Sequence, residues 1–129
     1  MKRTVLAFLI AVGVVVSGGR ALAHHSYAAN YLEDKTQKIE GNLVQFLYRN
    51  PHSFVHVDAK DEKGQMQRWT IEWGAGPQLI RQGVTRDKLK TGDRVIIIGN
   101  PGRNPAEHRL RMMNITRPSD GWKWSGTFE

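Results

Sequence analysis

Cysteine is absent from the 129 residues of this chain. The protein therefore has no disulfide framework, no thiolate metal site and no cysteine nucleophile. The sequence also lacks the patterns H-E-x-x-H and G-x-S-x-G, and its glycines form no phosphate-binding loop. These absences argue against zinc proteases and against hydrolases built on a serine triad. We expect a protein without enzymatic activity of its own, held together by its core alone.

Long apolar runs are also scarce, and the one at residues 5–16 follows the basic start Met1-Lys2-Arg3. This run is shorter than the roughly 20 residues that a membrane-spanning helix needs. Ala21 and Ala23 occupy the two small-residue positions of an A-x-A cleavage site. We predict a signal peptide over residues 1–23, cut after Ala23, and export to the bacterial periplasm. The alternative is that these residues stay attached as an uncleaved membrane anchor. If the signal peptide is cut off, we expect the mature protein to have no stable membrane anchor.

Charge of one sign is only mildly in excess once this leader is removed. The whole chain carries a net charge of +7, but Lys2, Arg3 and Arg20 lie in the leader, which leaves 16 basic against 12 acidic residues. Nucleic-acid-binding proteins typically gather their basic residues in one stretch or patch. The remaining charges of this chain are instead mixed along the sequence. We therefore expect no nucleic acid among the partners.

Alternating apolar and polar residues predict strands in the rest of the chain. They cover 39–48, 54–60, 65–73, 94–99 and 108–117. Gly74-Ala75-Gly76-Pro77 ends the third strand and introduces a short helix over 78–82, with proline at its first turn. The apolar run Val95 to Ile98 predicts a strand buried on both faces.

The order of these elements is strand, strand, strand, helix, strand, strand, which is the order of an OB-type barrel. We predict an all-β fold with one short helix, built as a five-stranded OB-like barrel with the helix between strands three and four. The predicted parts are an N-terminal arm over 24–38, the barrel over 39–118 and a C-terminal tail over 119–129. A chain of this length makes one small domain.

Several short motifs carry a resemblance to a known family. They are Ala23-His24-His25-Ser26-Tyr27, Asn50-Pro51-His52 and Trp69-Thr70-Ile71-Glu72. With them the chain resembles a family of small exported bacterial proteins that is classed as a domain of unknown function. The resemblance implies an exported, β-rich domain. It implies no activity and no binding residues.

The predicted cut gives the mature chain an unusual N-terminus. His24 would then offer both its α-amine and its imidazole, which together can chelate a metal ion. A third nitrogen from His52, His25 or His56 would complete a site for Cu(II), which favours tetragonal nitrogen ligands. Glu72 could orient one of these imidazoles. The alternative is that the two N-terminal histidines are merely exposed and that His52 caps a turn.

A second hypothesis is an OB-type module that binds a glycan, a peptide or an envelope protein partner without any metal. Stacking and basic side chains near strands two and three would then contact the ligand: Tyr48, Arg49, Phe54, Arg68 and Trp73. The competing interpretation is that Trp69, Ile71 and Trp73 form part of the core, because that face of the strand is strongly apolar.

Overall fold

The structure is a computed structural model, and it describes residues 27–128. The predicted signal peptide, together with His24 and His25, lies outside the described residues. Residues 27–30 are helical, and a compact unit begins at Tyr31. Within the described part of the chain, no helix is long and apolar enough to cross a membrane.

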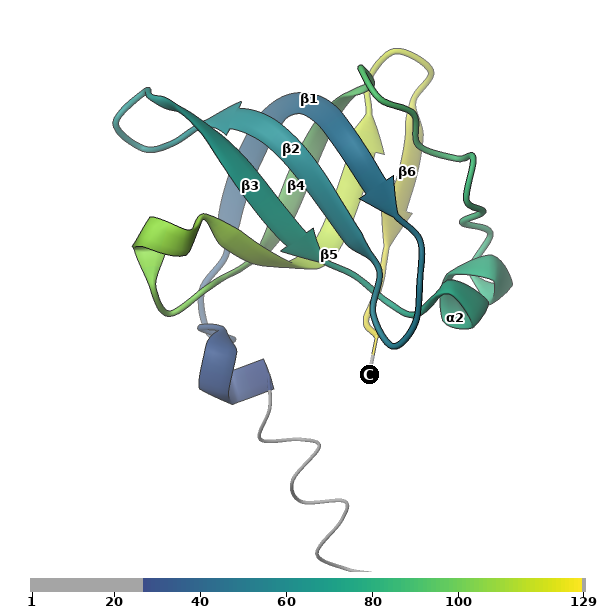
Figure 1. The fold of residues 1–129 in the computed structure, drawn as a ribbon, viewed down its shortest axis with the longest axis horizontal. Helices are drawn as coiled ribbons and strands as arrows, with labels where there is room; N and C mark the ends of the chain where they lie inside the picture. Colours follow the sequence, from purple (N-terminus) through teal and green to yellow (C-terminus); the bar gives the residue numbers. More distant parts are fainter. Residues whose placement is uncertain (1–26, 129) are drawn as a thin grey trace, which may run out of the picture. The chain divides into compact units, whose positions relative to one another are not determined.

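The unit that begins at Tyr31 is built mainly from strands (Figure 1). Its elements are β1 (Gln37–Leu47), β2 (Phe54–Lys60), β3 (Met66–Glu72), α2 (Gly76–Arg81), β4 (Arg94–Pro101), the 3₁₀ turn η1 (Pro105–Glu107), β5 (Arg109–Arg117) and β6 (Trp122–Ser125). The five predicted strands and the helix are all present, within two residues of the expected limits.

The strands close into a barrel. The sheet order is β3-β2-β1-β4-β5-β6, with antiparallel neighbours. A parallel pairing between β3 and β5, from Thr70↔Arg109 to Glu72↔Arg111, joins the two ends of the five-stranded ring. This arrangement, with α2 between β3 and β4, confirms the predicted five-stranded OB-like barrel. The sixth strand, β6, extends the sheet beyond β5.

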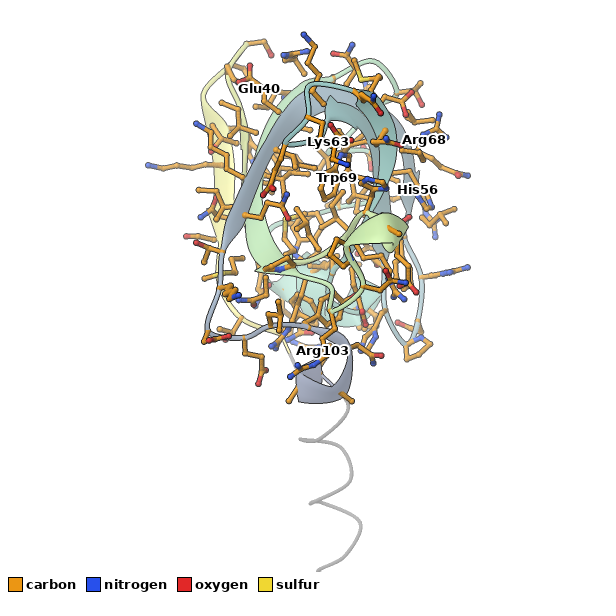
Figure 2. The ribbon with its side chains drawn as sticks, turned by 90° about the vertical axis from the view of Figure 1, so that its left-hand side faces the viewer. Glu40, His56, Lys63, Arg68, Trp69 and Arg103 are labelled. Atoms are coloured by element: carbon orange, nitrogen blue, oxygen red, sulfur yellow. The ribbon has the colours of Figure 1, made fainter. Side chains whose placement is uncertain are left out.

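The alternating residues of the strands fill the barrel interior. Val55 and Val57 of β2 are fully buried, as are Ile71 of β3 and Ile97 of β4. Figure 2 shows Trp69 inside the ring of strands. The prediction that β4 is buried on both faces is wrong, because the described elements leave its outer face partly open and Ile96 and Ile98 remain half-buried there.

Two glycines allow neighbouring strands to approach closely. A Cβ atom at Gly41 of β1 would collide with the backbone oxygen of Asp58, and one at Gly99 of β4 would collide with that of Arg111. Only glycine fits where backbones come this near. Both positions lie on strand pairs of the ring, so they help the strands to curve into a closed barrel.

The predicted C-terminal tail belongs to the same sheet. Its strand β6 pairs with β5 from Asn114↔Ser125 to Arg117↔Trp122. Trp124 of β6 is buried, as is Phe128 further along the chain. The tail therefore contributes to the core rather than hanging from the barrel.

Candidate functional site

A buried carboxylate joins three segments that are distant in the sequence. Glu72, the last residue of β3, is only 8% exposed. Its Oε1 atom lies 2.6 Å from Nδ1 of His52, and its Oε2 atom accepts a hydrogen bond of 2.5 Å from the Tyr31 hydroxyl. Arg109 places a guanidinium nitrogen 3.9 Å from the same Oε2 atom. We call these four residues the Glu72 cluster.

The backbone of the barrel brings these side chains together. The loop between β1 and β2 is tied to the end of β3 by two hydrogen bonds, from Ser53 N to Gly74 O at 3.1 Å and from Trp73 N to Ser53 O at 2.8 Å. This bonding places His52 beside Glu72. The parallel β3–β5 pairing brings Arg109 alongside, because Arg109 is the first residue of β5.

Tyr31 reaches the cluster from the segment before β1. It forms an isolated bridge with Gly102, and its side chain is 1% exposed. Burial, and to a smaller extent the hydrogen bond to Glu72, raises the pKa of the Tyr31 hydroxyl above its ordinary value of 10.0. The hydroxyl is therefore a proton donor throughout the physiological range. Its donated bond offsets part of the cost of burying the Glu72 carboxylate.

The His52–Glu72 pair has the geometry of a supported metal ligand. A carboxylate next to Nδ1 accepts its proton in a hydrogen bond, fixes the ring orientation and assigns any metal coordination to Nε2. One imidazole does not make a metal site. Among residues 27–128, no group of three or more histidine and carboxylate side chains is arranged to hold a metal ion. Further ligands would have to come from the predicted N-terminus, where His24 and His25 lie outside the described residues.

His56, another predicted ligand, occupies a different environment. It lies on β2, and its Nδ1 atom is 3.2 Å from the Thr70 hydroxyl. Partial burial, followed by the charges of Arg68 and Arg49, lowers the pKa of the His56 imidazole. The same two guanidinium groups repel a metal cation, so this environment favours His56 less than His52 as a ligand.

The side chains predicted for a ligand-binding face are largely engaged with the protein itself. The Tyr48 hydroxyl donates to Gly76 O at 2.7 Å. The guanidinium of Arg68 pairs with Asp58, which lies opposite it on β2. Arg49 lies over the ring of Phe54, with 5.2 Å between its Cζ atom and the ring centroid.

Trp73 requires a correction. Its side chain is 0% exposed and packs against Phe46 and Trp124, so it has no surface to offer a ligand. It belongs to the core together with Trp69 and Ile71, as the competing interpretation of that apolar face proposed.

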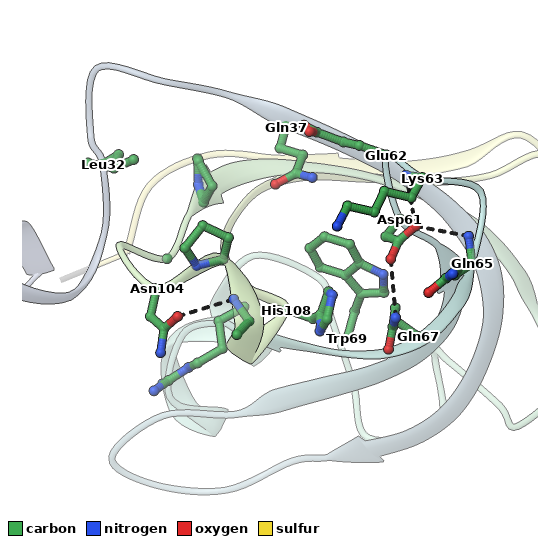
Figure 3. Close-up of a pocket in the computed structure, with 15 residues that line it drawn as sticks. Leu32, Gln37, Asp61, Glu62, Lys63, Gln65, Gln67, Trp69, Asn104 and His108 are labelled. Atoms are coloured by element: carbon green, nitrogen blue, oxygen red, sulfur yellow. Dashed lines mark hydrogen bonds between the residues drawn. The ribbon is translucent and has the colours of Figure 1, made fainter.

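A pocket of about 560 Å³ lies at the end of the barrel that carries the β2–β3 hairpin (Figure 3). Trp69 lies in the middle of the pocket, and Lys63 and Gln37 point toward its indole ring. The rings of His108 and Trp69 make an edge-to-face contact, with 5.1 Å between the ring centroids. Its walls come from the start of β1, the hairpin, β3 and the loop between β4 and β5. Sequence reasoning missed this pocket because no spacing links the hairpin to the β4–β5 loop.

The comparisons with known proteins give one match. A family model described as "Family of unknown function (DUF6152)" matches residues 11–111. No curated protein and no solved structure matches the chain.

Proposed function

We propose that this chain, which belongs to the family of unknown function DUF6152, is an exported binding protein that holds a Cu(II) ion in its mature form. In this proposal the protein carries out no reaction of its own. His52 is one ligand, and the new N-terminus created by a cut after Ala23 supplies the others.

The observation that carries the proposal is the 2.6 Å contact between His52 Nδ1 and Glu72 Oε1. Metal-binding histidines commonly donate their second ring nitrogen to a carboxylate, which fixes the tautomer and makes the coordinating nitrogen more basic. Glu72 is itself held by Tyr31, so the imidazole is supported by a second layer of hydrogen bonding. A histidine that only capped a turn would not need this support.

The length of the chain allows the N-terminus to contribute. His24 precedes Tyr31 by seven residues, and Tyr31 donates to the carboxylate that holds His52. A helix rises about 1.5 Å per residue and an extended chain spans at most about 3.6 Å per residue, so with residues 27–30 helical the α-amine of His24 could lie up to about 17 Å from Tyr31. The α-amine and imidazole of His24, with the imidazole of His52, would supply three nitrogen ligands of the kind that Cu(II) prefers.

The test is a Cu(II) titration of the processed protein, after mass spectrometry has located its first residue. We expect one equivalent to bind, with nitrogen couplings in the EPR spectrum. His52→Ala should weaken binding at least tenfold, as should His24→Ala or one extra residue before His24. His56→Ala is the matched control and should leave binding unchanged. Equal affinity in all these proteins would refute the proposal, as would a mature chain that begins at a residue other than His24.

The second candidate is a metal-free OB-type module, and the pocket around Trp69 is the observation that favours it. A cavity of this volume lies within the roughly 300–1,000 Å³ range of small-molecule sites. If the Cu(II) titration shows no metal binding, this second candidate is favoured. The chemistry of the pocket then indicates the class of ligand.

A further inference from the structure

One of the two edges of β3 is paired with a neighbouring strand along only half of its length. On one side β3 pairs with β2 over all seven of its residues, from Met66 to Glu72. On the other side it pairs with β5 only from Thr70 onward, and the hydrogen bond from Thr70 N to His108 O at 3.0 Å is the first bond on that side. Among the described residues, the first half of β3 thus has no neighbouring strand on this edge.

The geometry of strands identifies which backbone groups face this gap. Backbone N–H and C=O groups of alternate residues point to the same side of a strand. Since Thr70 bonds toward β5, the groups of Arg68 and Met66 point the same way. Both residues are exposed, and within residues 27–128 neither has a backbone partner on that side.

The gap opens beside the pocket around Trp69. The 3₁₀ turn η1 precedes β5 in the chain and contributes to the wall of this pocket. Pro105 and Ala106 of η1 line the pocket together with Gln67 and Trp69 of β3. Proline has no backbone N–H and a 3₁₀ turn does not match the spacing of a strand, so η1 cannot complete the ladder.

We propose that this gap is a docking site for an extended peptide segment of another protein, which adds as a strand to the free edge of β3. The inference does not depend on the proposed metal site. Unpaired strand edges bind peptides through main-chain hydrogen bonds, with side-chain pockets that select alternate residues. The peptide would bond to Met66 and Arg68 and place one side chain into the pocket.

The pocket also indicates the chemistry of that side chain. Trp69 points into the barrel, so the peptide residue beside it points inward as well. There it would enter the pocket around the indole, whose lining also includes Leu32 and Pro101, and an apolar residue fits this lining. The residue beside Arg68 points outward, close to the Arg68–Asp58 pair, and should be polar. A peptide that alternates apolar and polar residues fits both requirements.

A glycan is the competing occupant, and the free edge argues against it. Only a polypeptide offers backbone donors and acceptors at the repeat of a β-strand. Trp69 is also just 3% exposed, so it presents little of the flat ring face on which a sugar would stack.

The experiment uses the full mature protein and the capped heptapeptide Thr-Leu-Thr-Leu-Thr-Leu-Thr, followed by NMR of the backbone amides. We expect the largest shifts at Met66 and Arg68, and at least tenfold slower hydrogen exchange of the Arg68 amide at saturation. Two N-methylated peptides provide the matched control, one methylated at the leucines and the other at the threonines. Because alternate N–H groups face opposite edges, one isomer should bind at least tenfold more weakly and the other should bind unchanged.

A pair of variants tests the same edge from the protein side. Arg68→Pro removes the N–H that faces the gap but no bond to β2, whereas Arg68→Ala removes only the side chain and its ion pair. Peptide affinity should fall at least tenfold further in Arg68→Pro than in Arg68→Ala. If Arg68→Pro does not fold, the N-methylated peptides decide the matter on the native protein.

Three results would overturn the proposal. The first is equal binding of both N-methylated peptides. The second is a set of amide shifts that avoids Met66 to Trp69. The third is saturable binding of chitotetraose in the pocket without any binding of the heptapeptide.

Discussion

Nδ1 of His52 lies 2.6 Å from Oε1 of Glu72, although one residue is in a loop and the other ends a strand twenty positions later. The β1–β2 loop is bonded to the backbone just after β3, and this bonding sets the distance. Tyr31 and Arg109 contact the same carboxylate from two further segments. A buried carboxylate with this many partners holds the imidazole in one orientation, which is what a metal ligand requires.

The first prediction concerns the carboxylate. Glu72→Gln keeps the size of the side chain but removes the charge that supports the His52 imidazole. We expect Cu(II) affinity to fall about 10- to 100-fold, as measured by competition with a chelator. Glu62→Gln, in the exposed hairpin, is the matched control and should bind as the native protein does. If both variants bind equally well, Glu72 has no part in metal binding.

The second prediction concerns the ionisation of Tyr31, one of three tyrosines. Its pKa is raised because burial and Glu72 disfavour the phenolate. Its contribution to stability is therefore complete below the ordinary pKa of 10.0 and is lost as the pH rises from there toward the higher value of the folded state. In an alkaline titration followed by tyrosinate absorbance, we expect one tyrosine to ionise only as the protein unfolds.

Tyr31→Phe is the control for that titration. The late component should disappear, and the unfolding free energy at neutral pH should fall by about 1–3 kcal/mol, because the variant deprives a buried carboxylate of a donor. A late component that persists in Tyr31→Phe would assign it to another tyrosine.

The third prediction compares two buried tryptophans. Trp69 Nε1 donates to Ala59 O at 3.2 Å, whereas no partner of Trp73 Nε1 is found within the described residues. Replacement by phenylalanine removes a similar volume at either site, but only Trp69→Phe breaks a hydrogen bond. We expect urea unfolding to show that Trp69→Phe costs about 1 kcal/mol more than Trp73→Phe. An equal or larger cost for Trp73→Phe would contradict this.

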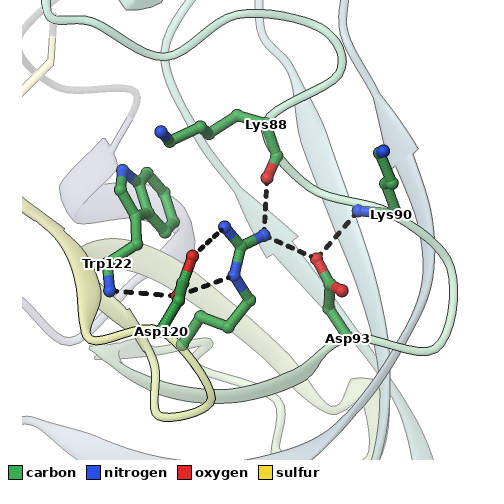
Figure 4. A network of polar contacts seen from close by, with 6 residues as sticks. Lys88, Lys90, Asp93, Asp120 and Trp122 are labelled. Atoms are coloured by element: carbon green, nitrogen blue, oxygen red, sulfur yellow. Dashed lines mark hydrogen bonds and ion pairs between the residues drawn. The ribbon is translucent and has the colours of Figure 1, made fainter.

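The fourth prediction concerns an ion-pair network that joins β5 to the turn before β6 (Figure 4). The Arg117 guanidinium bonds to Asp93 Oδ2, to Asp120 Oδ2 and to the backbone oxygen of Lys88, at 2.8, 2.8 and 2.7 Å. The hydrogen bond from Arg117 lowers the pKa of the Asp120 carboxyl most, and the bond from the Trp122 backbone amide adds to this effect. Together they lower this pKa from 3.8 to about 2.

A lowered pKa means that the stability from Asp120 is present above its ordinary value of 3.8 and is lost as the pH falls to about 2. Asp120→Asn should therefore be less stable than the native protein at pH 7, and this difference should shrink toward zero near pH 2. Urea unfolding at several pH values measures the difference. A difference that does not change with pH would exclude the carboxylate as its cause.

The strands and their order could be predicted because their signals are local. In β2 and β3, apolar residues alternate with polar ones, and the Asp61 to Gly64 turn separates the two strands. Side-chain periodicity of two depends only on neighbours in the chain. The order of the elements then indicated the barrel, and the family match confirms the resemblance that the motifs suggested.

The candidate site could be predicted only in part. From the sequence, Glu72 was expected to orient an imidazole, and in the structure its carboxylate contacts the imidazole of His52. Tyr31 and Arg109 were not expected at this carboxylate, since neither has a spacing that links it to Glu72. Trp73 was offered as a ligand contact because its aromatic type does not distinguish a surface platform from a core residue.

The sequence by itself thus determined the strand pattern, the turn positions, the absence of thiol chemistry and the prospect of an N-terminal histidine. Tertiary structure alone decided the Glu72 cluster, the pocket around Trp69 and the free edge of β3. The physical reason is the parallel pairing that begins at Thr70↔Arg109. It brings Arg109 to Glu72 and, within residues 27–128, leaves the preceding half of β3 without a strand on the edge opposite β2. This pairing depends on barrel closure between strands that local periodicity cannot relate.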